Sequence, residues 1–246
     1  MAFCQNTRHF SGSACIIETN PATLSMSLSE LFPPGALVAE LRESGDPAVL
    51  LPEERLCLKG AVHKRVQEFA AGRACARRLL DELGIIDFPI KVADDRQPLW
   101  PAAVVGSITH TAGFCAAVVA NKDSLSAVGI DSEIAGSVEA HLWRGICTPS
   151  ETDWLRSLPH AEQSAAATLI FSAKEAFYKC QYPLVHERLS FQDATVEPAW
   201  GAARGVFKIH ANRAIALARH AAMPLEGAYL FHEEFVTTGL ALPGLR

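Results

Sequence analysis

Residues 171–179 of this chain read FSAKEAFYK, and residues 129–133 read GIDSE. The first stretch reads as part of a helix, where Glu175 and Lys179, four residues apart, share one face. The second reads as a short strand, where side chains alternate between the two faces, so Asp131 and Glu133 point the same way. A helix and a strand that meet through these faces would bring three carboxylates and a lysine together.

Such a group of side chains is suited to phosphate chemistry. Three carboxylates that converge from two elements can hold a hard divalent cation such as Mg2+, which prefers oxygen ligands and keeps open positions for a substrate phosphate. Lys179 would supply positive charge to a phosphoryl oxygen or a leaving group. Each stretch also has an ordinary interpretation. Two acids separated by one residue are common in solvated turns, and a Glu–Lys pair with this spacing is common on exposed helices.

Three further stretches lie upstream: KRVQEFAAGR at 64–73, DRQPLWP at 95–101 and GSITH at 106–110. With the two stretches above they make five blocks, in order, between about residues 52 and 195. In this order and approximate spacing the blocks resemble the 4'-phosphopantetheinyl transferases of the surfactin and enterobactin synthetase type, including the siderophore-associated members.

The resemblance implies an α+β fold of two similar subdomains in a pseudo-twofold arrangement, with the active site at their interface. We place the subdomains at residues 1–123 and 124–246. The implied enzyme transfers the 4'-phosphopantetheine arm of coenzyme A to a serine of an apo acyl or peptidyl carrier protein and releases adenosine 3',5'-bisphosphate. Fatty-acid, polyketide and non-ribosomal peptide carriers all remain open as acceptors.

The resemblance also implies roles for the acids and the lysine. Asp131, Glu133 and Glu175 match the metal-ligand positions, where Mg2+ would bridge them and the pyrophosphate of coenzyme A. Glu175 is the expected general base for the serine, directly or through a water, and Lys179 would neutralise the leaving phosphate. Ser132 replaces the aliphatic residue common between the two acids and should face the opposite side of the strand.

Contacts with coenzyme A are expected in the basic stretch of this acidic chain, where Glu68 is the only acid between residues 59 and 78. Arg65 and Arg73, eight residues apart, lie on broadly the same side of a helix. Guanidinium groups suit phosphate oxygens, so we assign both to the 3'-phosphate or the pyrophosphate. Lys64 is a weaker candidate. The alternative is a solvated helix face.

The remaining expected contacts come from two other blocks. The resemblance gives His110 a phosphate contact, with Ser107 and Thr109 supporting its loop, although a lone histidine is more often structural. Lys174 lies roughly 100° around the helix from the following residue and could reach a phosphate at the cleft rim or face water. Trp100 and its flanking prolines would shape the wall near the adenine, or form a rigid loop plugged by a core tryptophan.

Composition sets the broad class of the protein. The 246 residues are 49% hydrophobic, enough for a substantial core. No apolar run approaches a membrane span, and residues 1–8 lack the features of a signal peptide, so we expect no membrane partner. Seven scattered cysteines without a CxxC pair indicate a reducing cytoplasm. The net charge of −5 gives no indication of nucleic-acid binding.

A helical pattern runs from Pro52 to about residue 83 and ends at Gly84, with Gly60 and Gly72 as points where it could break. A further helix is predicted to begin at the capping box 148–151, and a long helix over 161–181 to end before Pro183. Strands are predicted at 104–108, 114–120, 126–133, 194–196, 206–210, 229–231 and 235–242. Residues 36–41 could form a further strand, although Pro33, Pro34, Gly35 and Gly45 make much of that region loop-like.

Two other functions remain open at this point. One is a metal-dependent phosphohydrolase that cleaves coenzyme A or another nucleotide pyrophosphate, with water in place of the serine. A requirement for an acceptor protein separates it from a transferase. The other is a non-catalytic module that binds coenzyme A or a carrier, against which the three acids and Lys179 argue. Because both halves of the cleft belong to one chain, we expect a monomer.

The carrier is expected to dock beside residues 182–189, YPLVHERL, at the mouth of the cleft. Leu184 and Val185 would serve as apolar anchors and Arg188 as a steering charge, since desolvated apolar anchors usually give most of the binding energy. In the alternative interpretation, Leu184 and Val185 turn back into the core.

Overall fold

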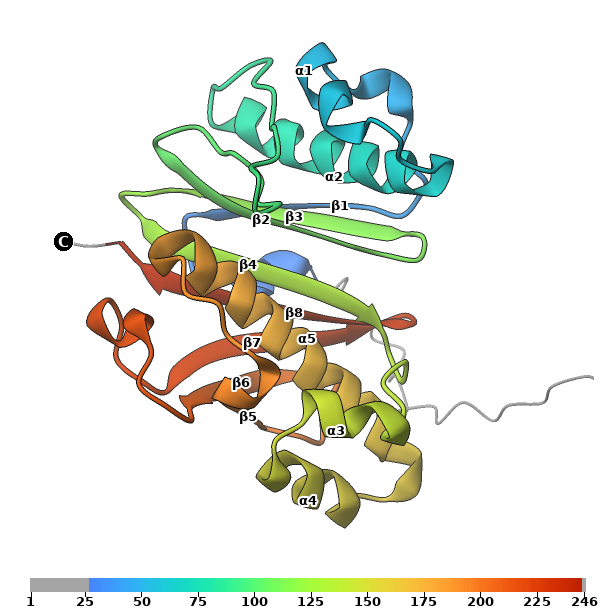
Figure 1. Ribbon diagram of the computed structural model, residues 1–246, viewed down its shortest axis with the longest axis vertical. Coiled ribbons are helices and arrows are strands. Elements are labelled where there is room, and N and C mark those ends of the chain that lie inside the picture. The colour runs from blue at the N-terminus through green and yellow to red at the C-terminus, as the bar shows by residue number, and fades with distance from the viewer. Residues whose placement is uncertain (1–26, 245–246) are drawn as a thin grey trace, which may run out of the picture.

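The computed structural model describes residues 27–244, which form two antiparallel sheets with helices packed on them (Figure 1). The smaller sheet has the strand order β1-β3-β2 and the larger sheet the order β4-β8-β7-β6-β5. Helix α2 packs on the smaller sheet, and helix α5 crosses the face of the larger one. The predicted α+β class is confirmed, because each half is an antiparallel sheet with a helix on it.

The turn at residues 122–124 separates the elements of the N-terminal half from those of the C-terminal half. The N-terminal half contains η1 (Leu28–Leu31), β1 (Ala36–Leu41), η2 (Pro47–Val49), α1 (Pro52–Arg55), η3 (Leu56–Leu58), α2 (His63–Glu82), β2 (Val104–Thr111) and β3 (Phe114–Asn121). The C-terminal half contains β4 (Leu125–Ile134), η4 (Ala140–Leu142), α3 (Trp143–Ile146), α4 (Pro149–Ser157), α5 (His160–Val185), η5 (Phe191–Asp193), β5 (Ala194–Pro198), β6 (Arg204–Ala211), η6 (Ala216–Arg219), β7 (Leu225–His232) and β8 (Phe235–Pro243).

The strands and the helix that begins at the capping box lie where the sequence predicts them. The expected break near Gly60 is found, since that residue has a φ of +77° between η3 and α2, whereas α2 continues through Gly72. Gly84 has the expected positive φ after α2. The predicted end of the long helix before Pro183 is wrong. α5 continues two residues past the proline to Val185, so the loss of the Pro183 N–H donor weakens the last turn without ending the helix at that residue.

Strands β2 and β4 lie side by side where the two sheets meet, yet no backbone ladder joins them. Instead, Ser107 Oγ accepts from the Ile130 amide at 3.2 Å, and Thr109 Oγ1 accepts from the Ser132 amide at 3.1 Å. Both pairs have a sequence offset of 23 residues, so the two strands run parallel. Hydroxyl groups thus connect the halves beside the predicted site.

An apolar core spans the two halves. Leu28 and Leu31 of η1 pack with Phe114 of β3 and with Leu230 and Phe235 of the larger sheet. Because η1 contacts strands of both sheets, the division into subdomains at residues 123/124 stays a proposal. The signal-peptide prediction for residues 1–8 lies outside the described residues. None of the helices between residues 27 and 244 is long and apolar enough to cross a bilayer.

Candidate active site

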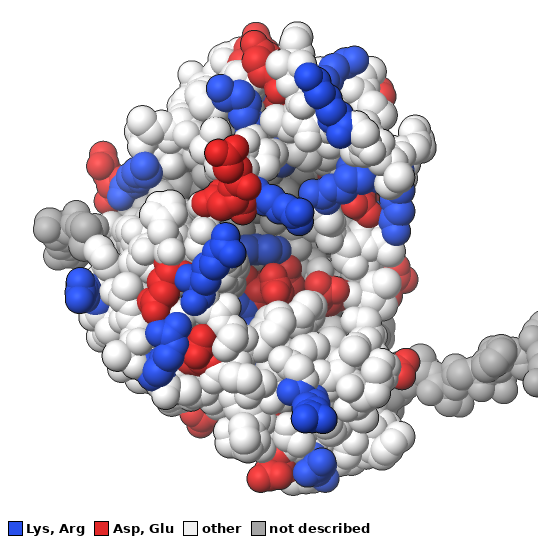
Figure 2. Space-filling view, viewed as in Figure 1, with Lys and Arg blue, Asp and Glu red and all other residues white. Residues whose placement is uncertain are grey.

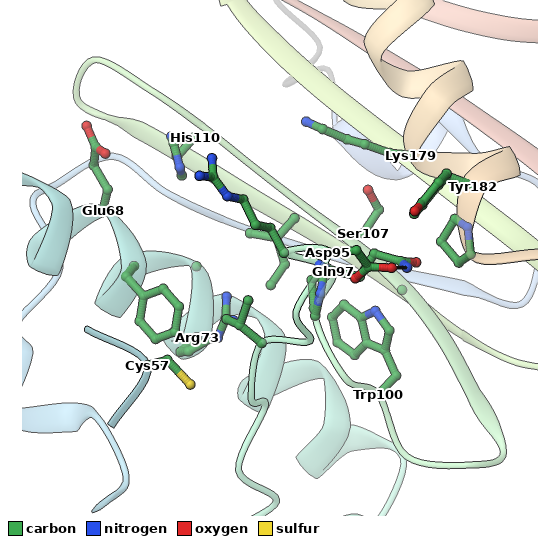
Figure 3. A pocket seen from close by; sticks show the side chains of 18 of the residues that line it. Cys57, Glu68, Arg73, Asp95, Gln97, Trp100, Ser107, His110, Lys179 and Tyr182 are labelled. Carbon is green, nitrogen blue, oxygen red and sulfur yellow. Dashed lines mark hydrogen bonds between the residues drawn. The ribbon is translucent and has the colours of Figure 1, made fainter. Parts of the chain in front are cut away.

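A cavity of about 560 Å³ opens between α2, β2, the loop at 91–101 and the C-terminal part of α5. Side chains from both halves of the chain surround it (Figure 3). Arg65, Arg73 and His110 line it from the N-terminal half, and Glu175 and Lys179 line it from α5. On the same face of the molecule, acidic side chains gather in a hollow with Lys and Arg side chains around it (Figure 2).

The position of α5 follows from a glycine in β4. A Cβ added at Gly129 would lie 2.0 Å from the carbonyl oxygen of Ala176 and 2.8 Å from the Cys180 amide nitrogen. Only a residue without a side chain allows the helix backbone to pack this closely on the strand. The contact brings Glu175 and Lys179 next to Asp131, two residues beyond the glycine.

Asp131 is the most constrained of the three predicted metal ligands. It is 4% exposed, and its Oδ1 accepts from Lys179 Nζ at 2.6 Å and from Thr109 Oγ1 at 3.2 Å. Its Oδ2 is buried and has no hydrogen-bond partner among the described residues. A buried, unpaired carboxylate oxygen is costly in the absence of a further donor or a cation.

Glu133 and Glu175 crowd the same region. Burial and then the charge of Asp131 raise the pKa of Glu133 to about 7. The same two causes, in the same order, raise the pKa of Glu175. Among residues 27–244, however, no group of three Asp, Glu, His or Cys side chains forms a metal-binding cluster. The three predicted carboxylates therefore lie close enough for the charge of Asp131 to raise the pKa of both glutamates, but in the described residues they are not already gathered around one metal position.

The basic side of the cavity is built from α2 and β2. Arg73 is 5% exposed, its Nε donates to the Ile90 carbonyl at 2.9 Å, and its guanidinium lies over the Phe69 ring. Burial lowers the pKa of Arg73 to about 10, so it stays charged at neutral pH. Arg65 Nη1 lies 2.5 Å from His110 Nε2. Desolvation and then the Arg65 charge lower the pKa of His110.

Lys174 lies neither at the rim of the cavity nor in water, the two positions that the sequence suggests for it. It is 3% exposed, and its Nζ donates to Glu151 Oε2 and to the carbonyls of Ile146 and Phe191 at 2.7–2.9 Å. All three ammonium donors are therefore used inside the protein. Lys174 is part of a buried ion pair that holds α5 to the start of α4, and we leave it out of the proposed ligand site.

Lys64 also lies away from the cavity. Its side chain is 78% exposed and is 3.9 Å from Glu68. Thr109 does not line the cavity either, because its hydroxyl lies between Asp131 and the Ser132 amide. Ser107, by contrast, lines the cavity beside the position where the strands β2 and β4 meet.

Trp100 lines the cavity and also packs against the core beside the smaller sheet, so its position agrees with both of its interpretations. Its indole ring lies against Gly106, where an added Cβ would come within 2.6 Å of the ring.

Residues 182–189, the segment expected to dock the carrier, do not present their two predicted apolar anchors fully to solvent. Leu184 and Val185 are half-buried against the C-terminal core, while Arg188 is exposed. This placement favours the alternative in which both side chains turn inward.

Comparisons with known proteins identify the family of this chain. Residues 52–120 match the family model described as the 4'-phosphopantetheinyl transferase N-terminal domain, and residues 127–229 match that of the 4'-phosphopantetheinyl transferase superfamily. The chain belongs to the 4'-phosphopantetheinyl transferase family. The predicted family and enzyme class are thereby confirmed. This family transfers phosphopantetheine from coenzyme A to carrier proteins.

Three relatives illustrate the match. The 4'-phosphopantetheinyl transferase PptT of Mycobacterium tuberculosis is 39% identical over 159 residues, which are 64% of this chain and 69% of that protein. Npt of Nocardia iowensis is 34% identical over 169 residues, 69% of this chain and 75% of that protein. Enterobactin synthase component D of Escherichia coli is 40% identical over 124 residues, 50% of this chain and 57% of that protein.

Some residues that line the cavity of this phosphopantetheinyl transferase were not singled out from sequence. Glu68 lies 3.7 Å from Arg65, and it is the lone acid of the basic stretch. Gln97 Nε2 donates to Asp95 Oδ2 at 2.6 Å in a tight turn of the loop that faces α5. Tyr178 and Tyr182 stack on each other on the opposite wall. The two tyrosines lie in or beside the quoted block 171–179. The sequence therefore gives their place on the helix, but nothing in the pattern indicates that their side chains point into the cavity.

Proposed function

We propose that this chain transfers the 4'-phosphopantetheine arm of coenzyme A to a serine of an apo acyl or peptidyl carrier protein, with Mg2+, and releases adenosine 3',5'-bisphosphate. One observation carries the proposal. A single cavity is lined on one side by the buried guanidinium of Arg73 and the more exposed one of Arg65, and on the other by Lys179 and by Glu175, which lies near the Asp131 carboxylate. The first side suits the phosphates of coenzyme A, and the second suits the reacting phosphoryl group.

The carboxylates fit a hard divalent cation by their chemistry. Asp131, Glu133 and Glu175 offer only oxygen donors, and Oδ2 of the first is buried without a partner. Burial and then the charge of Asp131 raise the pKa values of both glutamates, and a bound cation would oppose both effects. When bound, Mg2+ would supply positive charge to the pyrophosphate of the substrate.

The chain's own groups account for the proton and the leaving group. The serine oxygen forms a bond to the β-phosphorus, and the bond from that phosphorus to the oxygen bridging the two phosphates breaks. Glu175, which lines the cavity and has a raised pKa, would accept the serine proton. Lys179 lines the same cavity and would stabilise the negative charge on the departing bisphosphate.

Arg65, Arg73 and His110 would hold the remote phosphates. Within residues 27–244 the Nε of Arg73 donates to Ile90 and its guanidinium stacks on Phe69, which leaves its two Nη nitrogens without a hydrogen-bond acceptor and able to donate to a ligand. Arg65 contacts His110 and Glu68. A phosphate could replace either of these partners or bind Arg65 beside them. These contacts are made away from the reacting atoms, so they should govern binding more than the rate of chemistry.

The deciding experiment incubates the protein with coenzyme A, Mg2+ and a panel of apo carrier domains, and weighs the products by mass spectrometry. A carrier that gains the phosphopantetheine mass supports the transferase. Cleavage of coenzyme A without any carrier would instead support the phosphohydrolase alternative. Relatives named enterobactin synthase component D direct the first choice of acceptor toward peptidyl carriers of siderophore assembly.

We also infer that the enzyme works as a monomer in a reducing cytoplasm. Both sides of the cavity come from one chain. Cys75, Cys115, Cys147 and Cys180 are buried free thiols, and Cys57 is an exposed one. A thiol in an apolar interior behaves as a small hydrophobe and requires no oxidising compartment.

A further inference from the structure

A short basic and apolar segment borders the mouth of the cavity. Residues 55–65, RLCLKGAVHKR, contain four Lys or Arg residues and no acid, in a chain whose net charge is −5. The segment covers the end of α1, η3, the turn at Gly60 and the start of α2. A local excess of cations in an acidic protein indicates a site for an acidic partner.

The turn at Gly60 sorts the side chains of this segment between two directions. Its φ of +77° and the hydrogen bond from the Ala61 amide to the Leu58 carbonyl at 2.9 Å fix the backbone. Leu58 and Ala61 line the cavity. Leu56 and Val62 instead are 65% and 72% exposed. One side of the segment thus faces the cavity, and the other side presents apolar groups to solvent.

Cations flank these apolar groups. Arg55 donates to the carbonyls of Leu50 and Ala48, which leave its charge uncompensated, and Lys59 is exposed. Within residues 27–244, neither of them forms an ion pair with a carboxylate. We define Arg55, Leu56, Lys59 and Val62 as the mouth patch.

We propose that the mouth patch is the docking surface for the acceptor protein, which presents acidic side chains around exposed apolar ones. This inference rests on the proposed function, because only a transfer reaction brings a protein nucleophile to the cavity. Apolar anchors such as Leu56 and Val62 supply binding energy when desolvated, and the surrounding cations steer an acidic partner and fix its orientation. The segment 182–189, whose apolar side chains pack inward, would contribute less.

Val62 offers a substitution that preserves the fold. It is the N-cap residue of α2, and its side chain makes no capping hydrogen bond. Asn and Asp are both favoured at this position, so Val62→Asn and Val62→Asp should leave α2 intact or stabilise it. The pair is matched in size: both variants remove the apolar anchor, and only the aspartate adds a charge that repels an acidic partner.

The experiment measures steady-state transfer to a carrier domain that the wild-type enzyme modifies. We expect Val62→Asp to raise the KM for carrier about tenfold or more and Val62→Asn to raise it less. Lys59→Glu and Leu56→Gln should act in the same direction. The KM for coenzyme A and the melting temperature should not change. The difference between the aspartate and asparagine variants should shrink as salt is raised.

Ile86→Asp is the matched control, because Ile86 is also an exposed apolar residue, at 64%, beyond the opposite end of α2. That helix has 20 residues, so its ends are roughly 30 Å apart. This variant should keep the wild-type KM for carrier. The proposal is overturned if it behaves like Val62→Asp, or if all mouth-patch variants keep normal carrier kinetics.

Other outcomes separate the remaining explanations. Loss of binding to phosphatidylserine vesicles in the mouth-patch variants, with carrier kinetics unchanged, would assign the patch to a membrane surface and overturn the proposal. Absence of transfer by the wild-type enzyme to any carrier would overturn the proposed function and this inference with it. Normal wild-type transfer with unaffected variants overturns the docking surface alone.

Discussion

Asp131 and Lys179 form an ion pair with 2.6 Å between Oδ1 and Nζ, although the two residues come from a strand and a helix of distant sequence. The side chain of Asp131 is nearly inaccessible, while the side chain of Lys179 is 28% exposed and lines the cavity. The lysine therefore connects the buried acid to the space where coenzyme A is proposed to bind. It compensates one oxygen of Asp131, and the other oxygen remains unpaired.

This pair gives the first prediction. Asp131→Asn, Glu175→Gln and Lys179→Met should each lower kcat for transfer by about a hundredfold or more, because each removes a charge placed at the reacting phosphoryl group. Product formation by mass spectrometry measures the loss. Glu139→Gln, a change at an exposed acid that is not part of the cavity lining, is the control and should have no effect. Full wild-type activity in excess EDTA would contradict the role of the three acids.

The arginines of the cavity should separate binding from chemistry. Arg65→Ala is expected to raise the KM for coenzyme A about tenfold or more with little change in kcat, because it removes a contact equal in the ground and transition states. Arg78→Ala is the matched control on the same helix, since Arg78 is 72% exposed and only near Glu82. Equal affinities of the two variants, measured by calorimetry, would return Arg65 to a solvated helix face.

Dephospho-coenzyme A tests which arginine holds the 3'-phosphate. The variant that has lost this contact should show a smaller preference for coenzyme A over the dephospho form than the wild-type enzyme shows. Arg73→Ala is also expected to lower the melting temperature, because Arg73 is buried and hydrogen-bonded to the Ile90 carbonyl. The affinities of the Arg73→Ala variant and the wild type for coenzyme A should therefore be compared at a temperature where both proteins are folded.

Lys174 gives a prediction about stability. Lys174→Met leaves Glu151 buried without its cation and should lower the free energy of unfolding by about 3–5 kcal/mol. Burial lowers the pKa of Lys174 and the charge of Glu151 opposes that change, as expected for a buried pair. The double variant Lys174→Met, Glu151→Leu should recover part of the loss in urea unfolding. A stable single variant with a raised KM for coenzyme A would instead support the phosphate contact first predicted for this lysine.

The contrast between Glu175 and Lys174 shows what the sequence could predict. Neighbouring positions on a helix differ by roughly 100°, so Glu175 faces the cavity and Lys174 faces α4 and η5. The pattern of residues 171–179 identified the helix and the motif, but the direction of Lys174 depends on Glu151, a partner distant in sequence. Nothing near Lys174 in the sequence indicated that its three donors are used internally.

The two sheets show the same limit at the level of the fold. Alternation and turn residues predicted the strands, since these signals are local. The contact of β2 with β4 through Ser107 and Thr109 depends on how the sheets meet, and the resemblance had given both residues only to a phosphate loop. Pro183 likewise predicts a helix end from local rules, yet α5 ends two residues later, at Val185.

His232 should make stability depend on pH. Burial and then the charge of Arg42 lower its pKa below the ordinary 6.5, and Glu40 and Glu233 oppose this weakly. Phe114, Phe235 and Thr237 complete its surroundings. As pH falls below about 6.5, the unfolded chain binds a proton at this histidine before the folded one does, so stability is full above that pH and is lost below it.

The check is urea unfolding of the wild type and His232→Gln between pH 5 and 7.5. The variant should lose less stability than the wild type on acidification, because it has no proton to bind at this position. Parallel curves for the two proteins would show that His232 does not contribute. His110, whose pKa is also lowered, remains in both proteins and cancels in the comparison.

Gly129→Ala is predicted to move the site residues of α5 away from those of β4. The added Cβ would meet the Ala176 carbonyl oxygen at 2.0 Å, so α5 must move away from β4. Overpacking of this kind costs about 1–3 kcal/mol or more. It also displaces Lys179 from Asp131, so kcat should fall further than the loss of folded protein explains. Gly145→Ala, where nothing lies within 4 Å of the added Cβ, should be neutral in both assays. Wild-type kcat in a folded Gly129→Ala enzyme would show that the close contact of α5 with β4 does not position these residues.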